Sequence, residues 1–258
     1  ITQLDFYDDA KAIEFQAEVL HCFALTDDMI SQLTFSGEVE SMPSYAIVTD
    51  RTLFYPEGGG QLGDQGRFSQ NGKESPVLDT KSQEGVVLHF TANPLKLGKV
   101  KGTLNRDRRK QLMDHHTAVH IVGGAARHIL GPHIWQAGSN KGARYARLDI
   151  THHSRLTRKE IEAIEDLANN IVDSNLKIKK EVLDRSDADR KYGFDIYQGG
   201  PPKHSRIRVI SIGDFDVQAC GGTHHDQASS IGELRILKSS QVQDGVERLQ
   251  IVAGETSR

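Results

Sequence analysis

Two segments far apart in the chain hold side chains that bind transition metals. The first contains His116 and His120, four residues apart in a stretch of helical composition that ends at Gly131-Pro132. Residues four apart on a helix share one face, so both imidazoles can reach one ion. The second is Cys220-Gly221-Gly222-Thr223-His224, where a thiolate and an imidazole flank glycines that let the backbone fold tightly. Three nitrogens and one sulfur suit Zn²⁺, so these four side chains are the predicted zinc ligands.

The histidine pair alone is a weak signal, since the chain has 12 histidines and such a spacing arises by chance on many helices. The Cys220 segment strengthens the prediction, because a cysteine beside two glycines contributes little to a hydrophobic core. A zinc peptidase or amidase is disfavoured, because Thr117 follows His116 where the His-Glu-x-x-His motif requires glutamate.

An ordered series of segments runs along most of the chain. It comprises Asp50–Gln61, His116–His120, Gln136–Ser139, Tyr192–Gly200, Ala219–His224 and Gln243–Arg248. In these segments the chain resembles the editing region of alanyl-tRNA synthetases of the archaeal type, and the free-standing alanyl-tRNA editing proteins built from the same domain. One departure is Val119, which stands where the family often has a threonine.

The resemblance implies hydrolysis of serine or glycine wrongly attached to tRNA(Ala), with Zn²⁺ as cofactor and the acceptor end of that tRNA as partner. It also implies that the remaining synthetase domains of a longer parent would ligate alanine to tRNA(Ala) with ATP. The first residue is Ile1 and not Met, and the sequence of residues 192–200 resembles that of archaeal synthetases. Both favour a fragment of a synthetase. The alternatives are a free-standing editing protein and a non-catalytic tRNA-binding domain stapled by zinc.

By the same resemblance, Gln136 and Ser139 are expected to contact the amino acid or its ester, and Gln136 and His224 to act in catalysis. Val119 is placed in the substrate site, where a hydroxyl is then not essential. If all four ligands hold zinc, its tetrahedron is closed. If one of the four side chains does not bind, the zinc ion keeps an open position, where it can polarise a substrate carbonyl or lower the pKa of bound water to about 7. His224 or His115 could then transfer protons. The sequence leaves both arrangements open.

Selectivity for serine over alanine has a physical basis. A site that hydrogen-bonds a hydroxyl rejects the analogue lacking it by roughly 10⁴-fold or more, because its own polar groups would be left unpaired. Glycine has no hydroxyl and needs another explanation.

Composition narrows the class of protein. With 258 residues, 37% hydrophobic and 26% charged, the chain resembles an ordinary globular protein of one or two domains. Its net charge of −3 argues against a general nucleic-acid coat, although basic runs occur at residues 106–110, 177–180 and 203–208. Of these, the run at 106–110 is the best phosphate candidate. Two cysteines favour a reducing compartment, and no apolar run or leader is present, so a cytoplasmic location without membrane contact is expected.

The surrounding elements predict an α+β fold. Short alternating strands up to Asn105 indicate a small antiparallel β-barrel or sandwich, so residues 1–105 form the first predicted domain. The glycine-rich segment 56–66 lacks the Gly-Lys-Ser/Thr ending of a phosphate loop; it is either a turn or a wall of the substrate site. Residues 106–258 form the predicted zinc-containing editing domain, with the histidine-bearing helix, a second helix opened by a Thr157/Glu160 capping box, and antiparallel strands.

Overall fold

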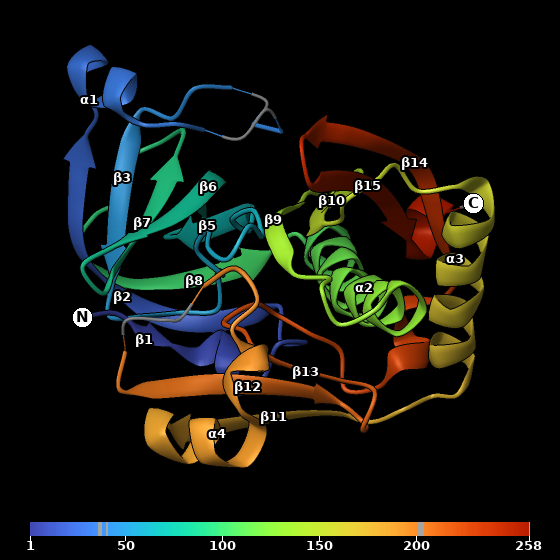
Figure 1. Ribbon diagram of the computed structural model, residues 1–258. Helices are drawn as coiled ribbons and strands as arrows, with labels where there is room; N and C mark the ends of the chain where they lie inside the picture. Colours follow the sequence, from blue (N-terminus) through green and yellow to red (C-terminus); the bar gives the residue numbers. More distant parts are fainter. Residues whose placement is uncertain (36–37, 40, 201–203, 258) are drawn as a thin grey trace. The chain divides into compact units, whose positions relative to one another are not determined.

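The computed structural model describes residues 1–35, 38, 39, 41–200 and 204–257, and it divides the chain into two compact units, residues 1–110 and 111–258 (Figure 1). Helix α2 (Arg106–Leu130) begins in the first unit and continues in the second. Lys203, the first residue of the third basic run, lies outside the described residues.

The first unit is built on a closed antiparallel barrel with strand order β2-β3-β7-β6-β5-β8. Its strands are β2 (Glu14–Ala24), β3 (Tyr45–Thr49), β5 (Gly66–Gln70), β6 (Lys73–Gln83), β7 (Val86–Thr91) and β8 (Gly98–Leu104). Outside the barrel lie β1 (Gln3–Leu4), which pairs in parallel with β4 (Arg51–Thr52), and α1 (Asp27–Gln32). The predicted α+β class with an antiparallel barrel is confirmed.

The barrel interior is filled by alternating side chains of its strands, as the period of a strand requires. Phe54 and Phe68 are fully buried and meet edge to face with ring centroids 5.4 Å apart. His89 lies among them, its Nε2 2.8 Å from the Thr52 hydroxyl and its Nδ1 3.0 Å from the Ile47 carbonyl. Burial lowers the pKa of His89 to about 4, so the ring is neutral at pH 7.

The glycine-rich segment forms a tight turn in which Gly58 and Gln61 exchange backbone hydrogen bonds of 3.0 and 2.9 Å. Asp64, just beyond the turn, is buried and receives the Arg109 guanidinium, whose Nε lies 3.0 Å from Oδ2. Arg108 is also buried and donates to Glu38 Oε2 at 2.6 Å. Two arginines of the first basic run are therefore structural ion-pair partners within this unit and not exposed phosphate contacts, which corrects the ranking of that run as the best phosphate candidate.

The second unit combines helices with two antiparallel sheets, ordered β14-β15-β10-β9 and β11-β12-β13. The elements besides α2 are α3 (Arg158–Asp173), α4 (Arg185–Tyr192), β9 (Gln136–Lys141), β10 (Ala146–Thr151), β11 (Ile178–Asp184), β12 (Arg206–Ile212), β13 (Asp216–Ala219), β14 (Leu234–Gln243) and β15 (Val246–Ala253). Short 3₁₀ helices of this unit occupy Phe194–Ile196, Ala228–Ile231 and Gly254–Ser257, and one of the first unit occupies Asp5–Tyr7.

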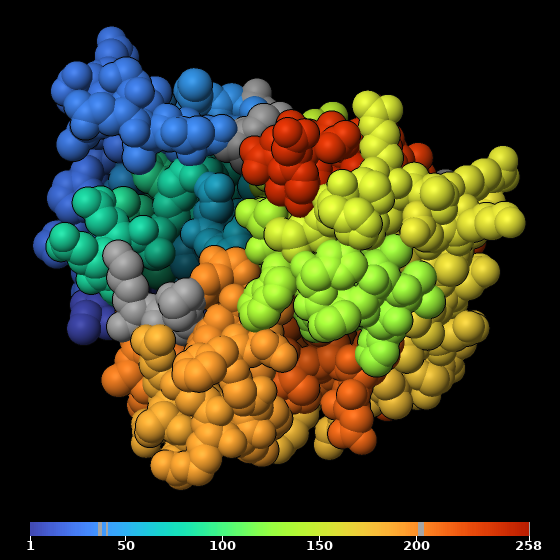
Figure 2. Space-filling model, viewed as in Figure 1, coloured from blue at the N-terminus to red at the C-terminus, as the bar shows by residue number. Residues whose placement is uncertain are grey.

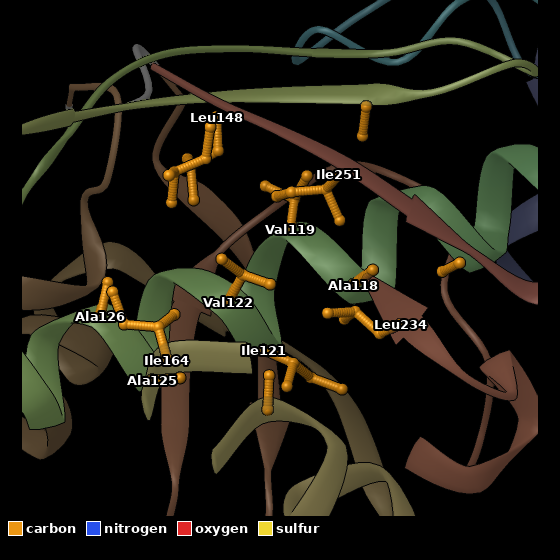
Figure 3. Packing of buried hydrophobic residues seen from close by; sticks show 14 of the residues in the cluster. Ala118, Val119, Ile121, Val122, Ala125, Ala126, Leu148, Ile164, Leu234 and Ile251 are labelled. Carbon is orange, nitrogen blue, oxygen red and sulfur yellow. The ribbon is translucent and has the colours of Figure 1, made fainter. Parts of the chain in front are cut away.

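Helices α2 and α3 share one hydrophobic core with the four-stranded sheet. Figure 3 shows Val119 and Val122 of α2 facing Leu148 and Ile251 of the sheet. Helix α3 begins at the predicted capping box, with the Thr157 side chain accepting from the Glu160 backbone and Glu160 reaching back. The core therefore fixes which face of α2 remains for His116 and His120. No helix among the described residues is long and apolar enough to cross a membrane.

Candidate metal centre

Four side chains of the second unit converge in one place. His116 and His120 come from successive turns of α2, and their ring centroids lie 5.5 Å apart. Cys220 and His224 come from the segment that follows β13, and the His224 ring lies 4.5 and 4.6 Å from those of His116 and His120. The four ligand atoms all lie within 4.8 Å of one another. The structure thus brings together all four predicted zinc ligands.

Their separations match what a tetrahedral zinc ion requires. Cys220 Sγ lies 3.3 Å from His116 Nε2 and 3.4 Å from His224 Nε2. Bonds of about 2.3 Å to sulfur and 2.0–2.1 Å to nitrogen give a sulfur–nitrogen separation of roughly 3.5 Å. The three histidines are buried and Cys220 is half-buried, so the donor set is shielded from water. The residues present fit a zinc ion in chemistry and in spacing.

The glycines let the second segment wrap around the first. A Cβ at Gly222 would lie 1.9 Å from Cε1 of the His116 ring, so only glycine fits there. Arg208 of β12 donates to the carbonyls of Cys220 and Gly222 at 3.0 and 2.8 Å. The Gly222 N–H points at Cys220 Sγ from 3.4 Å, a contact that stabilises a thiolate. Arg208, from the third basic run, therefore has a structural role in this loop.

Neighbours orient two of the imidazoles. The Thr117 hydroxyl lies 3.2 Å from His224 Nδ1, which leaves Nε2 turned toward Cys220. Asp216 Oδ2 lies 3.6 Å from His120 Nδ1, within ion-pair range although beyond an ordinary hydrogen bond. Carboxylate or hydroxyl partners on the far nitrogen of a histidine are typical of metal ligands, because they fix the ring and its tautomer.

The electrostatics favour a bound cation. Burial opposes ionisation of the Cys220 thiol, but the surrounding imidazoles of His116, His120 and His224 outweigh it and hold its pKa well below the usual range. Burial lowers the pKa of His116 to about 4 and that of His224 well below its ordinary value. For His120, the nearby thiolate and the Asp216 carboxylate overcome the effect of burial and raise the pKa to about 9. The Cys220 thiolate and the neutral His116 and His224 rings are donor states that zinc requires, and a bound ion would take the place of the proton that His120 holds.

Three polar side chains of β9 form a row on the face of the sheet from which the core residues of the neighbouring strand β10 project. Ser139 and Lys141 lie opposite Leu148 and Ala146 of β10. Gln136 lies three residues before Ser139 and five before Lys141, so simple alternation would place it on the other face. A β-bulge shifts the register and brings Gln136 opposite Ile150. Residues directly opposite on paired strands project to the same face, and Ala146, Leu148 and Ile150 are all core residues. Gln136, Ser139 and Lys141 therefore project to one face of the sheet.

Lys141 is the residue of this row that the sequence did not single out. It is buried, and its ammonium group donates to the Ser139 hydroxyl at 2.6 Å. Burial lowers the pKa of Lys141 to about 8, although the nearby Cys220 thiolate works in the opposite direction. The Cys220 charge acts on the Lys141 ammonium group, whose hydrogen-bond partner is Ser139.

The segment 192–200 supports Gln136. The Gln198 side-chain oxygen accepts a 3.0 Å hydrogen bond from the Gln136 backbone N–H. A Cβ at Gly199 would lie 3.0 Å from Gln136 Nε2, so the glycine leaves room for the amide. Gln198 is, after Lys141, a second residue that the sequence did not identify as part of the site. The only sequence feature that could have indicated it is its place in the family-like segment 192–200.

Two other predicted positions lie elsewhere. Val119 is 2% exposed and packs in the hydrophobic core, as Figure 3 shows. Because that packing turns its side chain into the core, we do not keep Val119 in the substrate site. The His115 ring is buried and tied by both nitrogens, Nδ1 at 2.6 Å from the Gly142 carbonyl and Nε2 at 3.1 Å from the Thr256 hydroxyl. These bonds give His115 a structural role.

Comparison with known proteins gives consistent matches. Residues 207–250, which include Cys220 and His224, match the family described as threonyl and alanyl tRNA synthetase second additional domain. Residues 3–108 match the family of class II (A) tRNA synthetases.

Curated proteins similar to the chain are alanine–tRNA ligases of archaea. The protein of Haloquadratum walsbyi is 44% identical over 253 residues, which cover 98% of this chain and 26% of that protein. The Methanopyrus kandleri protein is 42% identical over 258 residues, covering 99% and 26%. The Metallosphaera sedula protein is 45% identical over 220 residues, covering 84% and 24%. The chain thus spans about a quarter of the length of these relatives.

Proposed function

This chain belongs with the alanyl-tRNA synthetases, of which it matches one region, and we propose that this region hydrolyses the ester of Ser-tRNA(Ala) or Gly-tRNA(Ala). The proposal is supported above all by the buried Lys141–Ser139 hydrogen bond, which lies on the same face of β9 as Gln136 in the unit that holds the four metal-binding side chains. The remaining domains of a full-length synthetase would be its partners, together with the acceptor end of the tRNA.

In this proposal His116, His120, Cys220 and His224 hold a zinc ion. His224 is a ligand rather than a base, because Thr117 occupies its Nδ1 and Nε2 faces Cys220. When bound, zinc supplies positive charge and fixes the Cys220–His224 loop. If all four side chains bind the ion, they would supply the four ligands that zinc takes in structural sites. Proton transfer and charge stabilisation then fall to the chain's own residues on β9.

Lys141 and Gln136 are the groups proposed to act on the ester. The Lys141 ammonium group is a buried positive charge, and such a charge stabilises the oxyanion that forms when water attacks an ester carbonyl. Gln136 is half-buried and its backbone is held by Gln198, so its amide is placed to orient the carbonyl or the attacking water. Both groups are held before substrate arrives, which lowers the cost of reorganisation.

Ser139 is proposed to recognise the amino acid. Its hydroxyl already accepts from Lys141, which leaves its own proton free for a second partner such as the serine hydroxyl of the substrate. A pocket built on that pairing rejects alanine, since the polar groups would be left unpaired. The same reasoning predicts weaker discrimination between glycine and alanine.

The test is the rate of hydrolysis of Ser-tRNA(Ala) and Ala-tRNA(Ala) by this chain and by the Gln136→Ala and Ser139→Ala variants. We expect the chain to hydrolyse the seryl ester selectively, Gln136→Ala to lose rate on it, and Ser139→Ala to lose selectivity. Gln241→Ala, exposed on β14, is the matched control and should behave like the unmodified chain. Equal hydrolysis of both esters, or of neither, would contradict the proposal.

Cys220→Ala separates catalysis from the alternative of a zinc-stapled binding domain. Lost hydrolysis with tRNA affinity kept supports an editing site. Folding is measured by circular dichroism and tRNA binding by filter binding. Loss of both together supports a non-catalytic tRNA-binding domain that zinc stabilises.

A further inference from the structure

A second group of histidines lies in the same unit, away from the four residues described above. His133 precedes β9, and His152 and His153 directly follow β10. His133 Nε2 lies 2.9 Å from His152 Nδ1, and one nitrogen of each of the three rings lies within 4.8 Å of the others. His152 is buried, whereas His133 and His153 are exposed. Figure 2 shows that the light-green and yellow parts of the chain, which run from the end of α2 into α3, reach the surface.

The backbone fixes the positions of these histidines. The Thr151 hydroxyl donates to the His133 carbonyl at 2.6 Å and accepts from the Trp135 N–H at 2.8 Å. The Thr151 N–H donates to the Trp135 carbonyl at 2.9 Å, and the His152 N–H donates to the Gly245 carbonyl at 2.9 Å. Thr151 therefore ties the two strand ends together, so the rings meet with little loss of backbone freedom on binding a ligand.

A buried carboxylate lies close to this group. Glu247 of β15 stands opposite Ile150, two residues before His152 on β10. Since side chains two apart on a strand share a face, Glu247 and His152 are diagonal neighbours on one face. Glu247 is 2% exposed, and its Oε2 has no hydrogen-bond partner among the described residues. A buried carboxyl group with one unsatisfied oxygen on the same face as His152 favours a cation nearby.

We propose that His133, His152 and His153 form a second metal site, which takes a divalent transition-metal ion such as Zn²⁺ with water completing its coordination. Three imidazoles are a common ligand set for zinc, whose ligand nitrogens lie roughly 3.3 Å apart at bond lengths of 2.0–2.1 Å. The observed 2.9 Å between His133 and His152 opens to that value by a small ring rotation, and exposed His153 is free to turn inward.

The contacts of His152 define which of its nitrogens would bind the ion. Its Nε2 lies 3.5 Å from the Ser154 hydroxyl, which leaves Nδ1 as the nitrogen turned toward His133. The proposal is independent of the editing function, which uses none of these residues.

The test is zinc stoichiometry by equilibrium dialysis and elemental analysis of the whole chain, with free zinc buffered through the micromolar range. We expect the unmodified chain to bind one tight and one weaker equivalent. His153→Gln should weaken the second equivalent at least about tenfold, and His133→Ala should do the same, while the tight equivalent stays. The control is His21→Gln, which removes an exposed histidine of the first unit and should change neither equivalent.

Cobalt identifies which site fills. The first Co²⁺ equivalent should show a thiolate charge-transfer band from Cys220, and the second should add only ligand-field bands, which His153→Gln removes. A chain that binds a single equivalent throughout the range would overturn the proposal. So would a second equivalent unchanged in His153→Gln and His133→Ala, provided that both variants melt like the unmodified chain.

Discussion

Gly222→Ala tests whether the His116 ring is held where a metal ligand must be. The added Cβ would lie 1.9 Å from His116 Cε1 and 2.3 Å from Nδ1. Reaching an ordinary contact of 3.4 Å requires the ring or the loop to move by about 1.5 Å, while a metal site tolerates about 0.2 Å in its bond lengths. The ring cannot turn freely, because Cys220 Sγ lies 3.3 Å from its Nε2. Movement of the loop displaces Cys220 as well.

We therefore expect Gly222→Ala to weaken zinc binding by more than about 100-fold, the upper end of the loss caused by removing a residue that merely supports a ligand. Competition with a chromophoric chelator measures this affinity. Gly123→Ala is the matched control on α2, because its added Cβ would meet only Leu148 at an ordinary 3.7 Å. It should bind zinc normally, with stability unchanged or raised by up to about 1 kcal/mol. Zinc affinity of Gly222→Ala within a few-fold of the control would refute the assignment of His116 as a ligand.

Three further substitutions probe the support of the site, the catalytic proposal and the barrel. Asp216→Asn removes the carboxylate beside His120 and should weaken zinc affinity about 10- to 100-fold in the same competition assay. Lys141→Met should lower the rate constant for Ser-tRNA(Ala) hydrolysis about 10²- to 10³-fold with zinc content unchanged; a rate within a few-fold would exclude the charge from catalysis. His89 binds a proton more readily unfolded, near pH 6.5, than folded, near pH 4, so its contribution to stability is complete above pH 6.5 and is lost as the pH falls toward 4. Urea unfolding should show the unmodified chain losing about 2 kcal/mol more than His89→Gln between pH 7 and pH 5, and parallel losses would show that His89 is not buried neutral.

The metal cluster was predictable because its signals are local. A helix period places His116 and His120 on one face, and Cys220 and His224 are recognisable by type and spacing. The antiparallel barrel was predictable for the same reason, since alternation and turn residues are read over short windows. The sequence alone could not show that these two segments meet in space, because that depends on how α2 and the loop after β13 pack.

The role of Lys141, and the fact that it shares one face of β9 with Gln136 and Ser139, were not predictable from the sequence. Regular strand alternation counted from Gln136 would place Ser139 and Lys141 on the opposite face of the sheet. The β-bulge near Ile150 shifts the register, so that all three side chains share one face. Val119, expected in the substrate site from its family position, packs in the hydrophobic core of this structure. Family position identifies a residue, but the face it presents is decided by packing.

The most direct measurement of the central claim is the rate at which this chain hydrolyses Ser-tRNA(Ala) when it is loaded with zinc, stripped by a chelator, and reloaded. We expect hydrolysis to be lost when the tightly bound zinc is removed and to return when it is restored, and we expect no return in Cys220→Ala. Seryl-tRNA hydrolysis that persists at full rate in the stripped chain, with folding intact, would contradict this expectation.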